Sequence, residues 1–368
     1  MAGTTLTRGR PYFDKDTTDM IKGVGIIMMF CHHILTYQGW YIDGIYFPEM
    51  EDFCTFMAFP TKICVAIFAF LNGYLYAFNN KSRIRYSLSK ILSLYSVYWI
   101  VYLILLIPAL IWSGYRPGIT DIIRDLAALP NDVVRFGWYV FYFAVIMILL
   151  PLLKPLLDKN IWLAIGLSAV IITIMYSVNA TVATGFTEEM IYYFGWWTPV
   201  TLSGYIVGRY GLFEKTDGLL MSKIKSPVIK FVLSFALLIL CFFGRVFFRH
   251  FEFAIGDLKI CIFLCVDTVL VPLFIFSIVT LRNVIKVPGA DLVLRDAGKY
   301  SLYMWLIHSA FFGISSGIFQ KVLWLPHFPV LAFIWALILC YGLARLLEIP
   351  SRCISSGIKN GIDKEQKR

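Results

Sequence analysis

Three histidines within long apolar segments are the residues of this sequence best suited to catalysis. His32 and His33 follow Asp19 and Lys22 in the first apolar segment, and His308 lies in a late one. An ionisable side chain in such a segment is costly to bury, so each is a candidate functional residue. A buried imidazole titrates near neutral pH and therefore suits general-base work. The alternative is that these histidines only satisfy neighbouring helices.

Lys22 and His33 would share one face of a helix. They are eleven residues apart, which places them about 20° apart around the axis and roughly 16 Å apart along it. A cation at one end and a deeper imidazole would suit a long anionic donor whose head group stays in the cytoplasm. Asp19 lies three residues before Lys22 and could position it. Lys22 alone is explained equally well as a snorkelling lysine at the membrane boundary.

His308 and Asp267 are predicted to reach a similar depth. His308 is nine residues beyond Lys299, about 14 Å along a helix, and Asp267 is eight residues beyond Lys259, about 12 Å. Together with the histidines of the first segment they would form a polar cavity. An ion pair between Asp267 and Lys62 explains that carboxylate at least as well.

The elements that must position these residues are predicted to be membrane-spanning helices. Of the 368 residues, 59% are hydrophobic and 15% are charged, whereas soluble chains average about 45–50% apolar and about 25% charged residues. A spanning helix needs about 20 mostly apolar residues. Ten segments qualify: 18–37, 57–78, 91–112, 137–153, 161–177, 194–209, 228–248, 259–281, 300–319 and 328–349. The sequence therefore predicts an all-α polytopic membrane protein and excludes a secreted disulfide scaffold, a disordered chain and a soluble enzyme with one anchor. It also argues against an outer-membrane barrel, whose strands are short and alternate in polarity.

Basic residues predict the orientation of these helices. Lysine and arginine concentrate in every second connecting segment, which matches the positive-inside rule and accounts for the net charge of +10. Both termini are therefore expected in the cytoplasm, and we expect a multi-pass protein of the plasma membrane. Without an internal repeat or a long polar segment, residues 1–368 read as one integral-membrane domain. Its short cytoplasmic tails would cover about 1–17 and 351–368.

A basic segment after the second predicted span is a candidate phosphate-binding site. Arg83, Arg85 and Lys90 could bind phosphates, although the topology rule demands the same charges. The sequence contains no nucleotide-binding fingerprint and no cysteine or histidine spacing typical of a metal site. We therefore expect no metal, no permanently bound cofactor and no nucleic-acid partner.

Four motifs, in order along the chain, resemble those of the membrane-bound acyltransferase family 3. The first is Asp19-x2-Lys22-x10-His33, in which Lys replaces the usual Arg. The others are Asn72-Gly73-Tyr74 after a phenylalanine-rich stretch, Trp138-Tyr139 leading to Pro151, and Gly298-Lys299-Tyr300-Ser301 leading through Tyr303 to His308. The resemblance covers essentially the whole chain, and the family's usual number of spans is also ten.

The resemblance implies transfer of an acyl group, most often acetyl, from cytoplasmic acyl-CoA to a hydroxyl of a cell-surface or lipid-linked sugar. Acyl-CoA would be a co-substrate, and membrane lipid and the glycan acceptor would be the other partners. His33 would act as general base or transient acyl carrier, with His32 and Asp19 nearby. Lys22 and the basic segment would hold the donor. Further cavity candidates are Asn72, Tyr74, Trp138, Asp267, Tyr303 and His308.

Two departures from the family pattern concern donor binding. Lys22 offers a compact ammonium rather than the bidentate fork of Arg. The Arg-x2-Arg that follows the second helix in the family is replaced by Ser87-x2-Lys90, for which Arg83 and Arg85 could substitute.

Two other classes of function stay open at this point. A transporter or flippase of a glycan precursor would also use many helices and charges at mid-membrane depth, although the matching broken helices typical of transporters are absent from the sequence. A noncatalytic membrane module that senses a ligand is the second. The acceptor, the acyl group and the oligomeric state are not indicated by the sequence.

Overall fold

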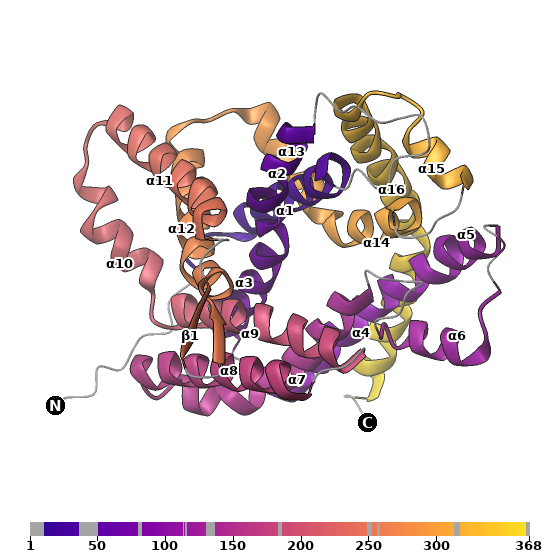
Figure 1. The fold of residues 1–368 in the computed structure, drawn as a ribbon, viewed down its shortest axis with the longest axis horizontal. Helices are drawn as coiled ribbons and strands as arrows, with labels where there is room; N and C mark the ends of the chain where they lie inside the picture. The colour runs from indigo at the N-terminus through magenta and orange to yellow at the C-terminus, as the bar shows by residue number, and fades with distance from the viewer. Residues whose placement is uncertain are drawn as a thin grey trace. The chain divides into compact units, whose positions relative to one another are not determined.

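The computed structural model describes residues 11–36, 51–79, 83–112, 114, 116–129, 137–182, 186–248, 252–255, 258–312 and 317–365 (Figure 1). The chain forms two compact units. The first comprises residues 1–25, 63–83 and 149–295, and the second comprises residues 26–62, 84–148 and 296–368. Helices α1 (Lys15–Thr36), α7 (Trp138–Leu157) and α13 (Pro288–Lys299) contribute residues to both.

The first unit is built mainly from apolar helices. Its elements are α3 (Ile63–Ala77), α8 (Ile161–Val182), α9 (Phe186–Arg209), α10 (Leu212–Leu219), the 3-10 turn η5 (Met221–Lys223), α11 (Pro227–Phe248), α12 (Ile262–Val284) and α13 (Pro288–Lys299). A short antiparallel hairpin, β1 (Glu252–Ile255) with β2 (Leu258–Cys261), connects α11 to α12, and Glu252 pairs with Cys261. Helix α3 packs against α9, and α11 packs against α12.

Glycines allow α3 and α9 to approach closely. A Cβ on Gly73 would lie 1.8 Å from the carbonyl oxygen of Thr201, and a Cβ on Gly204 would lie 2.1 Å from that of Phe70. Gly208 follows Gly204 at the four-residue spacing that brings membrane helices together. At the same contact, the Thr201 hydroxyl donates a hydrogen bond of 3.0 Å to the Ala69 carbonyl. The glycine of the Asn72-Gly73-Tyr74 motif is therefore required for helix packing.

The second unit contains the remainder of α1 and α7 with eight further helical segments. These are α2 (Glu51–Thr61), α4 (Arg83–Val101), a π-helical segment η3 (Tyr102–Leu106), α5 (Ile107–Trp112), α6 (Ile119–Leu126), α14 (Ser301–Phe312), α15 (Gly317–Leu323) and α16 (Pro329–Glu365). Helix α14 packs against α16 and η3.

The π-helical segment has a local cause and a tertiary consequence. Pro108 lies two residues beyond its end and has no N–H for the helical hydrogen-bond ladder, which widens the preceding turn. Tyr102, within this segment, donates a hydrogen bond of 2.7 Å to the carboxylate of buried Asp125 in α6. Tyr98 donates to the Asp125 carbonyl at 2.5 Å. The α4–η3 region and α6 therefore share a satisfied polar contact.

The helical architecture predicted from the sequence is confirmed. Within the described residues, six helical stretches are long and apolar enough to cross a membrane: Glu51–Ala77, Ile84–Trp112, Trp138–Leu157, Pro227–Phe248, Val266–Val284 and Pro329–Ser351. Each overlaps one of the ten predicted spans, and the other four predicted spans fall on α1, α8, α9 and α14. The count of ten and the cytoplasmic termini stay predictions.

Several predicted boundaries were wrong. The predicted span 259–281 begins on β2, because the charged and polar residues near Lys259 belong to a hairpin rather than to the helix. The predicted span 300–319 covers α14 (Ser301–Phe312) and the first residues of α15, and its residues 313–316 lie outside the described part of the chain. Helices α6, α10 and α13 were treated as connecting loops, because each is much shorter than the run of about 20 apolar residues that identifies a membrane span.

Candidate functional site

The histidines of the first and ninth predicted spans meet in the second unit. The ring centroids of His33 and His308 are 5.0 Å apart, and those of His32 and His33 are 5.2 Å apart. The ring of Phe30 lies 5.8 Å from that of His308. His32 and His308 are buried, and His33 is partly exposed. Helices α1 and α14 thus bring together three imidazoles from positions 275 residues apart in sequence.

Contacts within α14 and α7 orient His308. Its Nδ1 meets the carbonyl oxygen of Trp305, and because a carbonyl can only accept, Nδ1 carries the proton. In the neutral imidazole, Nε2 then holds the lone pair. Trp305 packs edge-on against Tyr139, with 5.5 Å between ring centroids, and Tyr139 packs edge-on against Trp138 at 5.5 Å. The Trp138-Tyr139 motif therefore supports the turn of α14 that carries His308.

Asp19 and Lys22 form an ion pair in the first unit, as their spacing predicted. The Lys22 Nζ lies 3.2 Å from an Asp19 carboxylate oxygen. The Lys22 side chain is 31% exposed and the Asp19 side chain 6%. Both line an open cavity of about 780 Å³ together with Lys15, Arg282 and Asn283. Asp14 also lines the cavity, so three cations and two carboxylates give its lining a small net positive charge.

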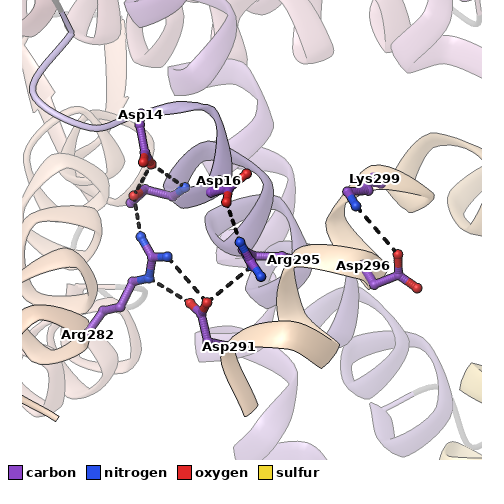
Figure 2. A network of polar contacts seen from close by, with 8 residues as sticks. Asp14, Asp16, Arg282, Asp291, Arg295, Asp296 and Lys299 are labelled. Carbon is purple, nitrogen blue, oxygen red and sulfur yellow. Dashed lines mark hydrogen bonds and ion pairs between the residues drawn. The ribbon is translucent and has the colours of Figure 1, made fainter. Parts of the chain in front are cut away.

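A network of charges fixes the beginning of α1 (Figure 2). Arg282, at the end of α12, binds Asp291 of α13 with an Nε–Oδ1 distance of 2.6 Å and also contacts the Thr17 hydroxyl. Arg295 of α13 reaches Asp291 at 3.1 Å and contacts Asp16. These ion pairs tie the first turn of α1 to α12 and α13. They hold the helix that carries Lys22 in place.

Asp14 caps the same helix. Its carboxylate accepts hydrogen bonds from the Thr17 amide at 2.8 Å and the Thr17 hydroxyl at 2.6 Å. These hydrogen bonds lower the pKa of Asp14 from its usual value, with a smaller contribution from the Arg282 charge. Asp14 therefore stays ionised near the positive N-terminal end of α1, where an anion is favourable.

Tyr74 anchors the segment before α1. Its hydroxyl accepts a hydrogen bond of 2.9 Å from the Tyr12 amide, and its ring stacks on Phe13 with 4.6 Å between centroids. Burial and the carboxylate of Asp217 raise the pKa of Tyr12. Tyr74 thus packs against the start of the chain. Its neighbour Asn72 is partly exposed on α3.

The prediction for Asp267 needs a correction. Its carboxylate is fully buried and forms a bidentate ion pair with Arg245 of α11, with Nε–Oδ1 and Nη2–Oδ2 distances of 2.7 and 2.8 Å. The sequence suggested Lys62 as the partner of Asp267. The structure instead pairs it with Arg245, which lies inside α11, where its charge requires a buried partner. Asp267 therefore has a structural role between α11 and α12.

The remaining candidates lie as follows. Arg85 and Lys90 are exposed on α4, and the Lys90 ammonium lies 5.5 Å from the centroid of the Tyr86 ring. Arg83 is the first residue of α4, and its side chain lies outside the described part of the structure. Tyr303 is buried on α14. The donor-binding role of the three basic residues stays a prediction.

Sequence reasoning missed residues that act through others. Trp305 holds His308, and Arg282 and Arg295 fix α1. Trp305 stands three residues before His308, so the helical spacing itself was a usable signal. For the two arginines no such signal exists, because their partners near the N-terminus are more than 260 residues away.

Comparison with known proteins identifies the family of this chain. A family model described as an acyltransferase domain matches residues 17–345, from the first turn of α1 into α16. The comparisons with curated proteins and with solved structures return no match. The matched range contains the three clustered histidines and the Asp19–Lys22 pair. This chain is a multi-pass membrane protein that belongs to the acyltransferase 3 family.

Proposed function

We propose that this protein transfers an acyl group, acetyl in the first instance, from cytoplasmic acyl-CoA to a hydroxyl of a cell-surface or lipid-linked sugar in the plasma membrane. Membership of an acyltransferase family supports the reaction class. The observation that carries the residue assignment is the contact between the His33 and His308 rings, which come from α1 and α14. A paired imidazole site within apolar helices is costly, and general-base catalysis uses that chemistry.

In the proposed reaction His33 removes the proton of the acceptor hydroxyl. The hydroxyl oxygen then attacks the thioester carbonyl, a new ester bond forms, and the carbon–sulfur bond breaks. The CoA thiolate leaves and takes up the proton from His33, so that no atom or charge is left over. The orientation of His308 supports this assignment, because its Nε2 lone pair can accept a hydrogen bond from a neighbouring imidazole or hydroxyl.

A second route gives His33 the role of transient acyl carrier. Its nitrogen would attack the thioester first and form an acyl-imidazole, and the acceptor hydroxyl would then displace the imidazole. In that case a labelled acyl group stays on the protein when acceptor is absent. The general-base route leaves the protein unlabelled, so one labelling measurement separates the two.

The donor is proposed to bind through Lys22, which would pair with an anionic group of CoA. The ion pair with Asp19 and the polar cavity around both residues support this role. Arg83, Arg85 and Lys90 would supply further cations to the phosphates. Acyl-CoA acts here as a co-substrate that enters and leaves.

The test compares two histidine variants in acyl transfer from radiolabelled acetyl-CoA to a lipid-linked sugar by the purified full-length protein. His33→Asn is expected to lower the rate by about 10²–10⁴-fold, the usual contribution of a general base. His327→Asn is the matched control, because His327 is exposed outside the cluster and asparagine tolerates its positive φ of 57°. Normal transfer by His33→Asn would remove this assignment.

The same preparation distinguishes an enzyme from a transporter. Reconstituted vesicles that move the sugar lipid across the bilayer without any covalent change would support a flippase. Mass spectrometry of cell-surface glycans with and without the protein would then identify the acyl group and the hydroxyl that receives it.

A further inference from the structure

An apolar groove in the first unit has no part in the proposed reaction. It has a volume of about 960 Å³ and lies against α11, α12 and α13. Phe231 and Phe235 of α11 stack along it, with 5.8 Å between their ring centroids, and Ile278 and Leu281 of α12 also line it. Its volume is within the range of about 300–1,000 Å³ found for small-molecule sites.

Helix α11 directs this groove towards lipid. It is long and apolar enough to cross a membrane, and only 17% of its most apolar stretch is buried in the protein. Phe235, which lines the groove, is 48% exposed. Apolar side chains that stay exposed on a spanning helix contact acyl chains when the helix is in a bilayer.

The positions of the lining residues along α11 and α12 match the head and tail of a phospholipid. The apolar stretch of α11 begins at Pro227, that of α12 ends at Val284, and the two helices pack together. From Pro227, Phe231 lies about 6 Å and Phe235 about 12 Å into the stretch. Lys286 lies two residues beyond Val284 and also lines the groove. Lys286 therefore lies just outside the end of the apolar stretch of α12, and the apolar residues that line the groove lie within the apolar stretches of α11 and α12.

The charge of the groove comes from Lys286. The two other charged residues that line it, Arg282 and Asp291, neutralise each other in an ion pair of 2.6 Å. Lys286 is exposed, and within the described part of the chain no ion pair includes it. Lys223, Lys225 and Lys230 stand near the same end of α11 and add to the positive potential there.

We propose that this groove binds one anionic phospholipid of the adjacent leaflet. Its phosphate contacts Lys286, and one acyl chain lies along Phe231 and Phe235 between α11 and α12. The charge match selects an anionic head group over a zwitterionic one, because a lysine near the surface gives about a fivefold preference. The groove is lined by neither Lys22 nor the clustered histidines, so this proposal does not depend on the proposed reaction.

Native mass spectrometry of the full-length protein tests this proposal. The protein is mixed with equal amounts of phosphatidylglycerol and phosphatidylcholine that carry identical acyl chains. We expect one retained lipid per chain, with phosphatidylglycerol preferred. Lys286→Gln should reduce that preference about fivefold. Lys215→Gln, which removes an exposed lysine of α10 outside the groove, should leave it unchanged.

A second variant tests the location. Ala290 lines the groove and is exposed, so Ala290→Trp fills the space and should expel both lipids without affecting the fold. Equal retention of the two lipids by the wild-type protein would overturn the proposal. It would also be overturned if Lys286→Gln behaved like Lys215→Gln, or if Ala290→Trp retained lipid as the wild type does.

Discussion

Loss of either member of the Arg245–Asp267 pair should destabilise the protein severely. Both side chains are 0% exposed, and two hydrogen bonds of 2.7 and 2.8 Å join them. Arg245→Met leaves the Asp267 carboxylate buried without its partner. Breaking a buried ion pair from one side costs about 3–5 kcal/mol, whereas an exposed pair contributes about 0–1 kcal/mol. We therefore expect the free energy of unfolding to fall by about 3–5 kcal/mol.

Restoring charge balance should recover this loss. The double variant Arg245→Met/Asp267→Leu replaces both charges by apolar side chains. Its free energy of unfolding is expected to exceed that of either single variant by several kcal/mol, because no lone charge stays buried. Unfolding by SDS titration in mixed micelles measures these free energies. Arg345→Met is the control, since that side chain is 54% exposed and lies 3.9 Å from Asp296.

The double variant also decides whether the reasoning holds. If the two single variants are as stable as the wild type, the pair is not desolvated as the structure shows. If the double variant is as unstable as the singles, the cost comes from lost packing between α11 and α12 rather than from an isolated charge.

Three further predictions concern packing, pH and the histidine site. Gly204→Ala should lower the free energy of unfolding by about 1–3 kcal/mol, because the added Cβ would overlap α3. Gly166→Ala, in open space on α8, should not destabilise the protein. Equal effects of the two substitutions in SDS titration would contradict this prediction. The pKa of Asp14 is lowered in the folded protein, so its contribution to stability is present above its unfolded pKa of about 3.9 and disappears as the pH falls through the folded value. Melting temperatures of wild type and Asp14→Asn should therefore converge in acid, and a constant difference would refute the assignment. Trp305→Leu should lower kcat for acyl transfer but leave the KM for acyl-CoA unchanged, and a change in KM alone would show that Trp305 acts on donor binding.

Local regularity made much of the fold predictable. The length and spacing of apolar segments predicted helices at every position where the structure has a long one. Helical spacing also predicted the Asp19–Lys22 ion pair, since residues three apart on a helix are neighbours. The short helices and the hairpin were missed because each is far shorter than a membrane span, which is the element that the length of an apolar segment predicts.

Partner choice depended on helix packing instead. Whether Asp267 pairs with Lys62 or with Arg245 cannot follow from spacing, because α11 and α12 meet only after folding, and a buried charge takes whichever opposite charge that packing supplies. The contact between the rings of His33 and His308 likewise depends on which helices pack together and not on local spacing. Residue type and helical period fix which face of a helix is polar, and the close contact at glycines such as Gly204 then determines which other helix that face meets.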